Sequence, residues 1–80
     1  MKYVYLLKSI SLPEKRYVGL TSNLTKRIKE HNAGKLPYTE AFKSWKLVVA
    51  IKFSDDQKAD AFERYLKSGS GHAFARRHFW

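Results

Sequence analysis

The sequence predicts an α/β domain of the α+β type, with elements in the order β-β-α-β-α and a short helix at the C-terminus. Two short segments rich in Tyr, Val and Leu lie at the start of the chain, a strand-like alternation lies near its middle, and two segments show helical spacing behind capping residues. Eighty residues have too little interior for two cores, so we expect residues 1–80 to form one domain.

Residues 2–8 and 16–20 are expected to form a β-hairpin, because a loop-like stretch that contains Pro13 separates them. Alternate residues of a strand share a face, so pairing that sets Tyr5 opposite Tyr17 would place both phenols on one side of the sheet. Gly19 has no side chain, which leaves room for a ligand or another backbone close to the sheet.

A first helix is expected over about residues 23–33. Asn23 and the two residues before it supply capping oxygens, apolar residues recur at helical spacing, and Gly34 is a suitable stop. Arg27 and His31 lie one turn apart on this helix and border its apolar stripe.

Residues 35–44 contain Pro37 and no clear period, so we expect an irregular connection with room for a short helical turn. Residues 45–53 follow, in which large apolar side chains occupy every second position. This is the best strand signal in the chain, and it predicts the third and central strand.

Residues 54–57 read as a capping box that opens a second helix. Glu63 lies beside the apolar stripe of that helix, so its carboxylate can face the edge of the sheet. The Ser/Gly stretch 68–71 is expected to break the helix. Residues 72–79 are then expected to form a last helical turn or two with Phe74 inward.

Sixteen Lys and Arg against seven Asp and Glu give a formal charge of +9. A body this positive attracts polyanions, and nucleic acid, DNA first, is the expected partner because each neutralised phosphate releases condensed counterions. The alternative is a solvated basic surface that keeps the protein soluble. The side chains expected to contact the nucleic-acid backbone are Lys8, Lys15, Arg16, Lys35, Lys43, Lys46, Lys67, Arg76 and Arg77.

The chain has no cysteine, so disulfides and thiolate metal sites are excluded and any metal must be bound through oxygen. The N-terminal residues lack the features of a signal peptide, and no segment approaches the ~20 apolar residues that span a bilayer. We therefore expect a soluble, cytoplasmic protein without a membrane partner.

The order of these residues resembles the GIY-YIG nuclease superfamily, and specifically its small single-domain members, over nearly the whole chain. Tyr3-Val4-Tyr5 is similar to the first signature tripeptide and Tyr17-Val18-Gly19 to the second. Arg27, His31 and Glu63 fall where that family keeps its active site.

The resemblance implies a small antiparallel sheet flanked by helices and one divalent cation, Mg²⁺ or Mn²⁺, held by Glu63. Arg27 would clamp the phosphate. Either signature tyrosine could be the base that activates water if nearby positive charge assists it. We favour Tyr17, with Tyr5 orienting water or phosphate, and His31 would relay a proton or bind the phosphate.

Each residue also has a structural interpretation. Glu63 could simply pair with Lys67, and Arg27 with Glu30 or Glu14, as helical charges usually do. His31 could be a half-buried histidine of the core.

The predicted function is a metal-dependent DNA endonuclease with little sequence specificity, and DNA repair or recombination is a candidate setting. The alternative is a basic nucleic-acid-binding accessory module of the same fold that cuts slowly or not at all. Two departures from the family pattern favour it: Leu20 stands where some relatives carry lysine, and Ala75 stands where many carry asparagine. The first tripeptide also departs from the pattern, because it begins with Tyr3 in place of glycine. No base-reading module accompanies the domain, so strong specificity would need a protein partner.

Overall fold

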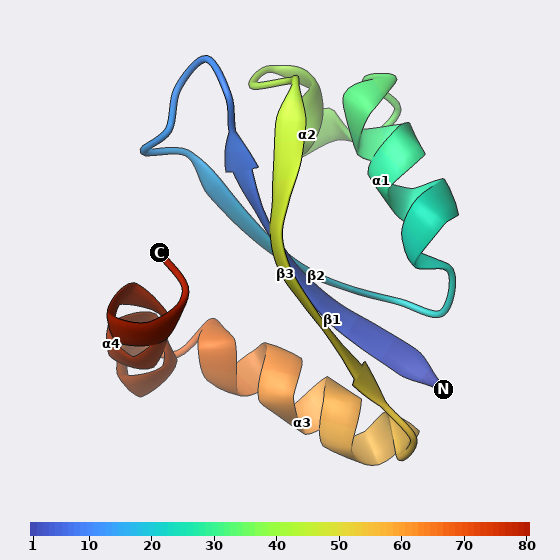
Figure 1. The fold of residues 1–80 in the computed structure, drawn as a ribbon, viewed down its shortest axis with the longest axis vertical. Helices are drawn as coiled ribbons and strands as arrows, with labels where there is room; N and C mark the ends of the chain where they lie inside the picture. The colour runs from blue at the N-terminus through green and yellow to red at the C-terminus, as the bar shows by residue number, and fades with distance from the viewer.

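The computed structural model describes residues 1–80 and has the predicted fold class, one three-stranded antiparallel sheet with helices (Figure 1). Its elements are β1 (Lys2–Ser9), β2 (Arg16–Thr21), α1 (Leu24–Asn32), α2 (Pro37–Glu40), β3 (Trp45–Phe53), α3 (Asp56–Leu66) and α4 (Gly69–His78). The one-turn helix α2 lies in the stretch for which a short helical turn was expected. None of the four helices combines the length and the apolar character needed to cross a lipid bilayer.

The strands lie in the order β2-β1-β3, so the central strand is β1. The prediction that residues 45–53 form the central strand is therefore wrong. A strand covered on both faces needs a continuous apolar run, and β1 has one in Val4–Leu7, where all four side chains are buried. The alternation in β3 belongs to an outer strand, in which Lys46 and Lys52 remain exposed.

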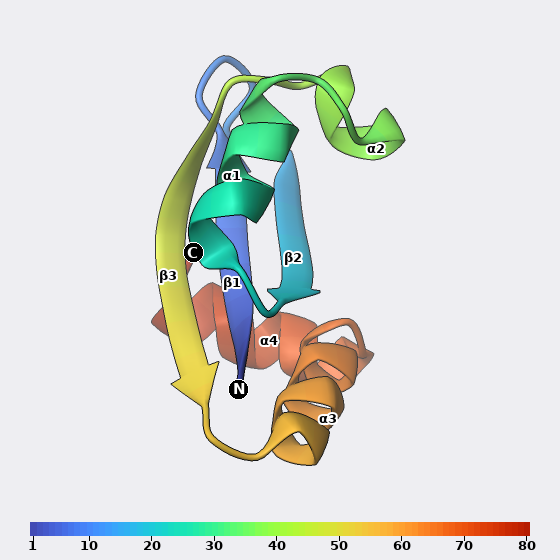
Figure 2. The ribbon, with the colours of Figure 1, turned by 90° about the vertical axis from the view of Figure 1, so that its right-hand side faces the viewer.

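The two faces of the sheet carry separate cores. Val4 and Leu6 pack on one face against side chains of α3 and α4, while Tyr5 and Leu7 pack on the other face against side chains of α1. Figure 2 shows this arrangement, with α1 in front of the sheet and α4 behind it. The side chains of β1 alternate between the two cores, which is how one strand serves both.

The ends of α1 and α3 follow from their capping residues. The Asn23 side chain accepts a hydrogen bond from the backbone N–H of Lys26 at 3.1 Å, and Gly34 ends the helical region with φ of +76°, as expected. Helix α3 starts one residue later than the predicted capping box. Its N-cap is Asp55, whose carboxylate accepts from the N–H of Gln57 at 2.9 Å.

Helix α4 is longer than predicted, because the Ser/Gly stretch belongs to it. Ser68 is the N-cap and accepts a hydrogen bond from the N–H of Gly71 at 3.2 Å. Gly71 is buried against α3, where a Cβ would collide with the carbonyl group of Tyr65. This glycine permits the close contact of α3 with α4, while Phe74 points inward as expected and Arg76 and Arg77 are exposed.

Candidate active site

The phenol of Tyr5 crosses the neighbouring strand at Gly19. These two residues are paired in the β1–β2 register, and Tyr17 is paired with Leu7. The assumed pairing of Tyr5 with Tyr17 was thus two residues off, but both phenols still share one face. A Cβ at position 19 would lie 2.7 Å from Cε1 of Tyr5 and closer still to its hydroxyl end. The room beside Gly19 is therefore taken by the Tyr5 ring and not by a ligand.

A buried chain of hydrogen bonds continues from the Tyr5 hydroxyl. The hydroxyl lies 2.8 Å from Nε2 of His31, and Nδ1 of His31 lies 2.8 Å from Oγ1 of Thr39. The Thr39 hydroxyl also lies 3.4 Å from the carbonyl oxygen of Leu36, to which it can donate. We therefore assign the ring proton of His31 to Nδ1, which donates a hydrogen bond to Oγ1 of Thr39, while Nε2 accepts one from the Tyr5 hydroxyl.

Burial shifts both titrating members of this chain toward their neutral forms. It raises the pKa of Tyr5 above its ordinary value, with a further rise from the neighbouring Tyr17. It lowers the pKa of His31, with a further decrease from the nearby Arg27 cation. A protonated phenol and a neutral imidazole are also the forms used in the hydrogen-bond assignment above. The half-buried histidine considered from the sequence is in fact fully buried, with 0% exposure.

Tyr17 packs against His31 and also reaches solvent. The two ring centroids lie 4.8 Å apart in an edge-to-face arrangement, and the Tyr5 ring lies 6.2 Å from that of Tyr17. Tyr17 lines a hollow of about 330 Å³ together with Lys67 and other side chains. Of the two signature tyrosines, Tyr5 is buried and Tyr17 is accessible.

Arg27 lies beside these rings on α1. Its Nε pairs with Oε1 of Glu30 at 3.5 Å, which is one of the two structural pairings considered from the sequence, and the side chain remains 39% exposed. After burial, the Arg27 charge contributes to the lowered pKa of His31 and acts against the raised pKa of Tyr5. The cation is therefore near both groups, and its side chain makes no other ion pair.

Glu63 lies on α3, where its side chain is only 15% exposed and pairs with Lys67. Burial raises the pKa of Tyr5 most, Tyr17 and Glu30 raise it further, and the Glu63 carboxylate makes the smallest contribution in the same direction. Nowhere do three His, Cys, Asp or Glu side chains gather. A lone carboxylate fits a hard cation that takes its remaining ligands from water and substrate, as Mg²⁺ commonly does, once the Lys67 ammonium moves aside.

The nine predicted backbone-binding cations do not lie together. Arg16 and Lys67 line the hollow beside Tyr17, and Arg76 lines an adjoining one. The others are dispersed: Lys15 stacks over the Phe42 ring at 5.1 Å, and Arg77 lines a separate hollow on α4. Lys35 lines a hollow at α1, and the remaining predicted cations, Lys8, Lys43 and Lys46, line none of the hollows.

Two residues of the site were missed from the sequence. Thr39 lies in a stretch without any period, so nothing in the pattern distinguishes it from a loop threonine. Tyr38 precedes it, and its ring stacks on Tyr17 at a centroid distance of 6.0 Å. An exposed aromatic residue next to a proline was the only available signal. Two of the residues that depart from the family pattern, Leu20 and Ala75, belong to the apolar core under α3 and α4.

A family model of the GIY-YIG catalytic domain matches residues 1–76, so the chain belongs to this family, whose members are generally nucleases. This confirms the resemblance inferred from the signature residues. Among its relatives is a UPF0213 protein of Clostridium perfringens, 43% identical over 68 residues that cover 84% of this chain and 71% of that protein. The solution NMR structure of a UPF0213 protein from Bacillus halodurans is 29% identical, with a TM-score of 0.58 over 95% of this chain and 81% of the other.

Proposed function

We propose that this protein is a metal-dependent endonuclease that hydrolyses phosphodiester bonds in DNA with little sequence specificity, with residues 1–80 acting as one nuclease domain. One observation carries the proposal. Tyr5, Tyr17 and His31 are in direct contact, and the charges of Arg27 and Glu63 are close enough to act on the pKa of Tyr5. Three side chains from three elements are thus in contact, and the charges of Arg27 and Glu63 act on one of them.

Tyr17 is the residue that we propose activates the attacking water. Tyr5 is unsuited to this role, because its raised pKa keeps the phenol protonated and its hydroxyl is engaged in a hydrogen bond to His31. An ordinary phenol is a weak base near neutral pH, so Tyr17 depends on neighbouring cations to assist it. Arg16 and Lys67 line the same hollow as Tyr17, and the Arg27 charge acts on the adjoining Tyr5.

His31 had two predicted roles, phosphate binding and proton relay. Both ring nitrogens are hydrogen-bonded inside the protein, which leaves neither free for a phosphate or for a proton from Tyr17. We propose instead that His31 positions the two tyrosines, Tyr5 through its hydrogen bond and Tyr17 through the ring contact. Thr39 fixes the tautomer of His31, because its hydroxyl oxygen accepts a hydrogen bond from Nδ1 and leaves Nε2 free to accept one from Tyr5.

Arg27 is the proposed phosphate clamp. Its Nε is engaged by Glu30, which orients the guanidinium and leaves the terminal nitrogens as donors for two phosphate oxygens. Glu63 would hold the divalent cation, Mg²⁺ or Mn²⁺. Such a cation, when bound, stabilises the negative charge on the departing 3′ oxygen.

The test is nicking of a supercoiled plasmid with Mg²⁺ or Mn²⁺, comparing the wild type with Glu63→Ala and Arg27→Ala. Arg64→Ala, an exposed arginine on the same helix as Glu63, is the matched control. We expect metal-dependent nicking that falls by roughly 100-fold or more in the two site variants and is unchanged in the control. Nicking that persists unchanged in both site variants would rule out this active site.

The alternative function, a basic nucleic-acid-binding module that cuts slowly or not at all, is favoured by the ion pair that occupies Glu63 and by the apolar residues at positions 20 and 75. The same assay separates the two functions. Salt-sensitive DNA binding by a wild-type protein that never nicks supports the module.

A further inference from the structure

Two hollows join along the outer edge of β2. One, of about 330 Å³, contains Tyr17, Tyr38 and Lys67, and the other, of about 250 Å³, contains Arg76 and Trp80. Both are also lined by Arg16, Val18 and His72, so they form one continuous depression, which we name the β2-edge groove. It starts at the proposed base, Tyr17, and ends at the C-terminal residue.

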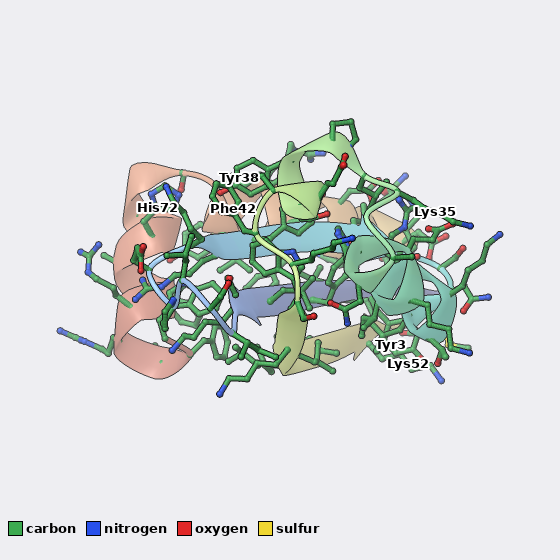
Figure 3. All side chains as sticks on the ribbon, turned by 90° about the horizontal axis from the view of Figure 1, so that it is seen from above. Tyr3, Lys35, Tyr38, Phe42, Lys52 and His72 are labelled. Atoms are coloured by element: carbon green, nitrogen blue, oxygen red, sulfur yellow. The ribbon has the colours of Figure 1, made fainter.

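Elements from both faces of the sheet form the walls of this groove. In Figure 2, α2 lies near the upper end of β2 and α3 near its lower end, and in Figure 3 Tyr38 of α2 and His72 of α4 both lie on the β2 side of the molecule. Because β2 pairs only with β1, its outer edge has no partner strand. An extended ligand can therefore lie along this edge, with Tyr38 of α2 at one end and His72 and Arg76 of α4 at the other.

The groove is positively charged and contains no acidic side chain in its lining. By contrast, the two hollows beside α1 both include Glu30. Arg16 lies over the Trp80 ring at 5.1 Å, which holds the guanidinium in place, and neither Arg16 nor Arg76 forms an ion pair. Two uncompensated guanidinium groups on one extended surface suit a chain of phosphates.

Aromatic side chains are interspersed with these cations. Tyr38 is 50% exposed, and its ring is nearly parallel to that of Tyr17, with 27° between the planes. An exposed ring fixed from behind by a second ring is a stacking platform for a base. Alternating cations and exposed rings are the pattern by which proteins hold a nucleic-acid strand whose bases are accessible.

We propose that the β2-edge groove binds the strand segment that flanks the scissile phosphate, with phosphates on Arg16 and Arg76 and a base stacked on Tyr38. The proposal rests on the proposed function for its position beside Tyr17. It selects Arg16, Lys67 and Arg76 from the nine cations predicted from the sequence. It also adds Tyr38, which no charge-based prediction includes.

The test is fluorescence anisotropy of a labelled oligothymidylate with EDTA present, so that binding is measured without cleavage. Arg76→Ala and Tyr38→Ala remove one cation and one ring from the groove. Their matched controls on α3 are Arg64→Ala and Tyr65→Ala, an exposed arginine and a 39%-exposed tyrosine outside the hollows. We expect about fivefold or greater loss of affinity for each groove variant and no comparable loss for the controls.

Salt dependence separates the two groove residues. Arg76→Ala should reduce the slope of log affinity against log salt by about one, while Tyr38→Ala should leave the slope unchanged. Tyr38→Phe keeps the ring and should bind like the wild type, which distinguishes lost stacking from a disturbed fold. Far-UV circular dichroism checks that each variant is folded.

Wild-type affinity in both groove variants, or an equal loss in the Arg64 and Tyr65 controls, would overturn the proposal. The readout does not depend on catalysis. If the protein binds through the groove but never nicks, the proposed endonuclease activity is contradicted and the groove proposal stands. If it nicks and binds without needing Arg76 and Tyr38, only the groove proposal is contradicted.

Discussion

The Tyr5 ring lies over the Cα of Gly19 on the neighbouring strand, and its hydroxyl continues past that position to His31. The absence of a side chain at Gly19 thus allows the Tyr5 ring to point toward His31. Because the β1–β2 register pairs these two residues, the phenol occupies the space above Gly19, and its hydroxyl meets His31 of α1 on the same face of the sheet. The hydrogen-bond chain, and with it the position of Tyr17 against His31, depends on this crossing.

Gly19→Ala should therefore disturb the site. The new Cβ would overlap the Tyr5 ring, which is only 1% exposed and is therefore enclosed by other side chains. We expect a loss of about 1–3 kcal/mol in the free energy of unfolding, as overpacked cores show, together with a loss of nicking. Urea unfolding measures the first quantity and the plasmid assay the second.

Gly69→Ala is the control for that change. Nothing lies within 4 Å of the position where its Cβ would be, and the residue is in the first turn of α4. The substitution should leave stability unchanged or raise it slightly, because alanine loses less backbone entropy on folding. Equal destabilisation by both substitutions would show that the overlap with Tyr5 is not the cause.

Removal of the Thr39 hydroxyl should destabilise the protein, because His31 loses a hydrogen-bond partner. Thr39→Val keeps the shape of the side chain but leaves the Nδ1 proton of His31 buried without an acceptor. A cost of about 1–3 kcal/mol in the free energy of unfolding is expected. Thr39→Ser, which keeps the hydroxyl, should retain most of the stability. A valine variant as stable as the serine variant contradicts the assigned hydrogen bond.

Stability should decrease in mild acid because of His31. Its pKa in the folded protein is lowered by burial and by Arg27, so the unfolded chain binds this proton more readily. The contribution is complete above the unfolded pKa of about 6.5 and is lost as the pH falls below it toward the folded value. Urea unfolding between pH 8 and 5, at about one-unit steps, measures this slope.

The comparison that isolates this effect is His31→Gln, which should show a shallower slope than the wild type over the same range. His72→Gln, at an exposed position, should keep the wild-type slope. Parallel slopes for all three proteins would mean that other groups carry the pH dependence.

The ion pair at Glu63 should compete with a metal ion. Lys67→Ala frees the carboxylate, so Mn²⁺ should bind more tightly to the protein alone, by roughly twofold, given the usual strength of such i,i+4 pairs. Electron paramagnetic resonance of free Mn²⁺ measures the binding, and Glu63→Gln should abolish it. Mn²⁺ that binds equally to Glu63→Gln must be held elsewhere.

Much of this arrangement is readable from the residue pattern. Because side chains alternate along a strand, Tyr5 and Tyr17 stay on one face when the strand pairing shifts by an even number of residues. The register itself depends on the geometry of the connecting loop, which the sequence does not specify, and it was predicted two residues off. The unbroken apolar run of β1 indicates a central strand. The alternation in β3 is the clearer strand signal, but it indicates a strand and not a central position.

The polar contacts behind the site could not be predicted in this way. Thr39 meets His31 only because α2 folds back over α1, and no local period describes that approach. Likewise, the Ser/Gly stretch looks like a helix breaker until the packing of α4 on α3 requires a glycine at position 71. Sequence periodicity predicts single helices and strands, whereas the roles of Thr39 and Gly71 depend on contacts between helices.

Both outer strands of the sheet have one backbone edge with no partner strand, and such edges are open to pairing with another molecule. Arg16 on β2 and the two lysines of β3, Lys46 and Lys52, are all exposed, and the chain as a whole carries a charge of +9. Mutual repulsion between copies therefore opposes aggregation through these edges. A variant neutralised along β2 would lose this protection, and its solubility would fall along with its affinity for polyanions.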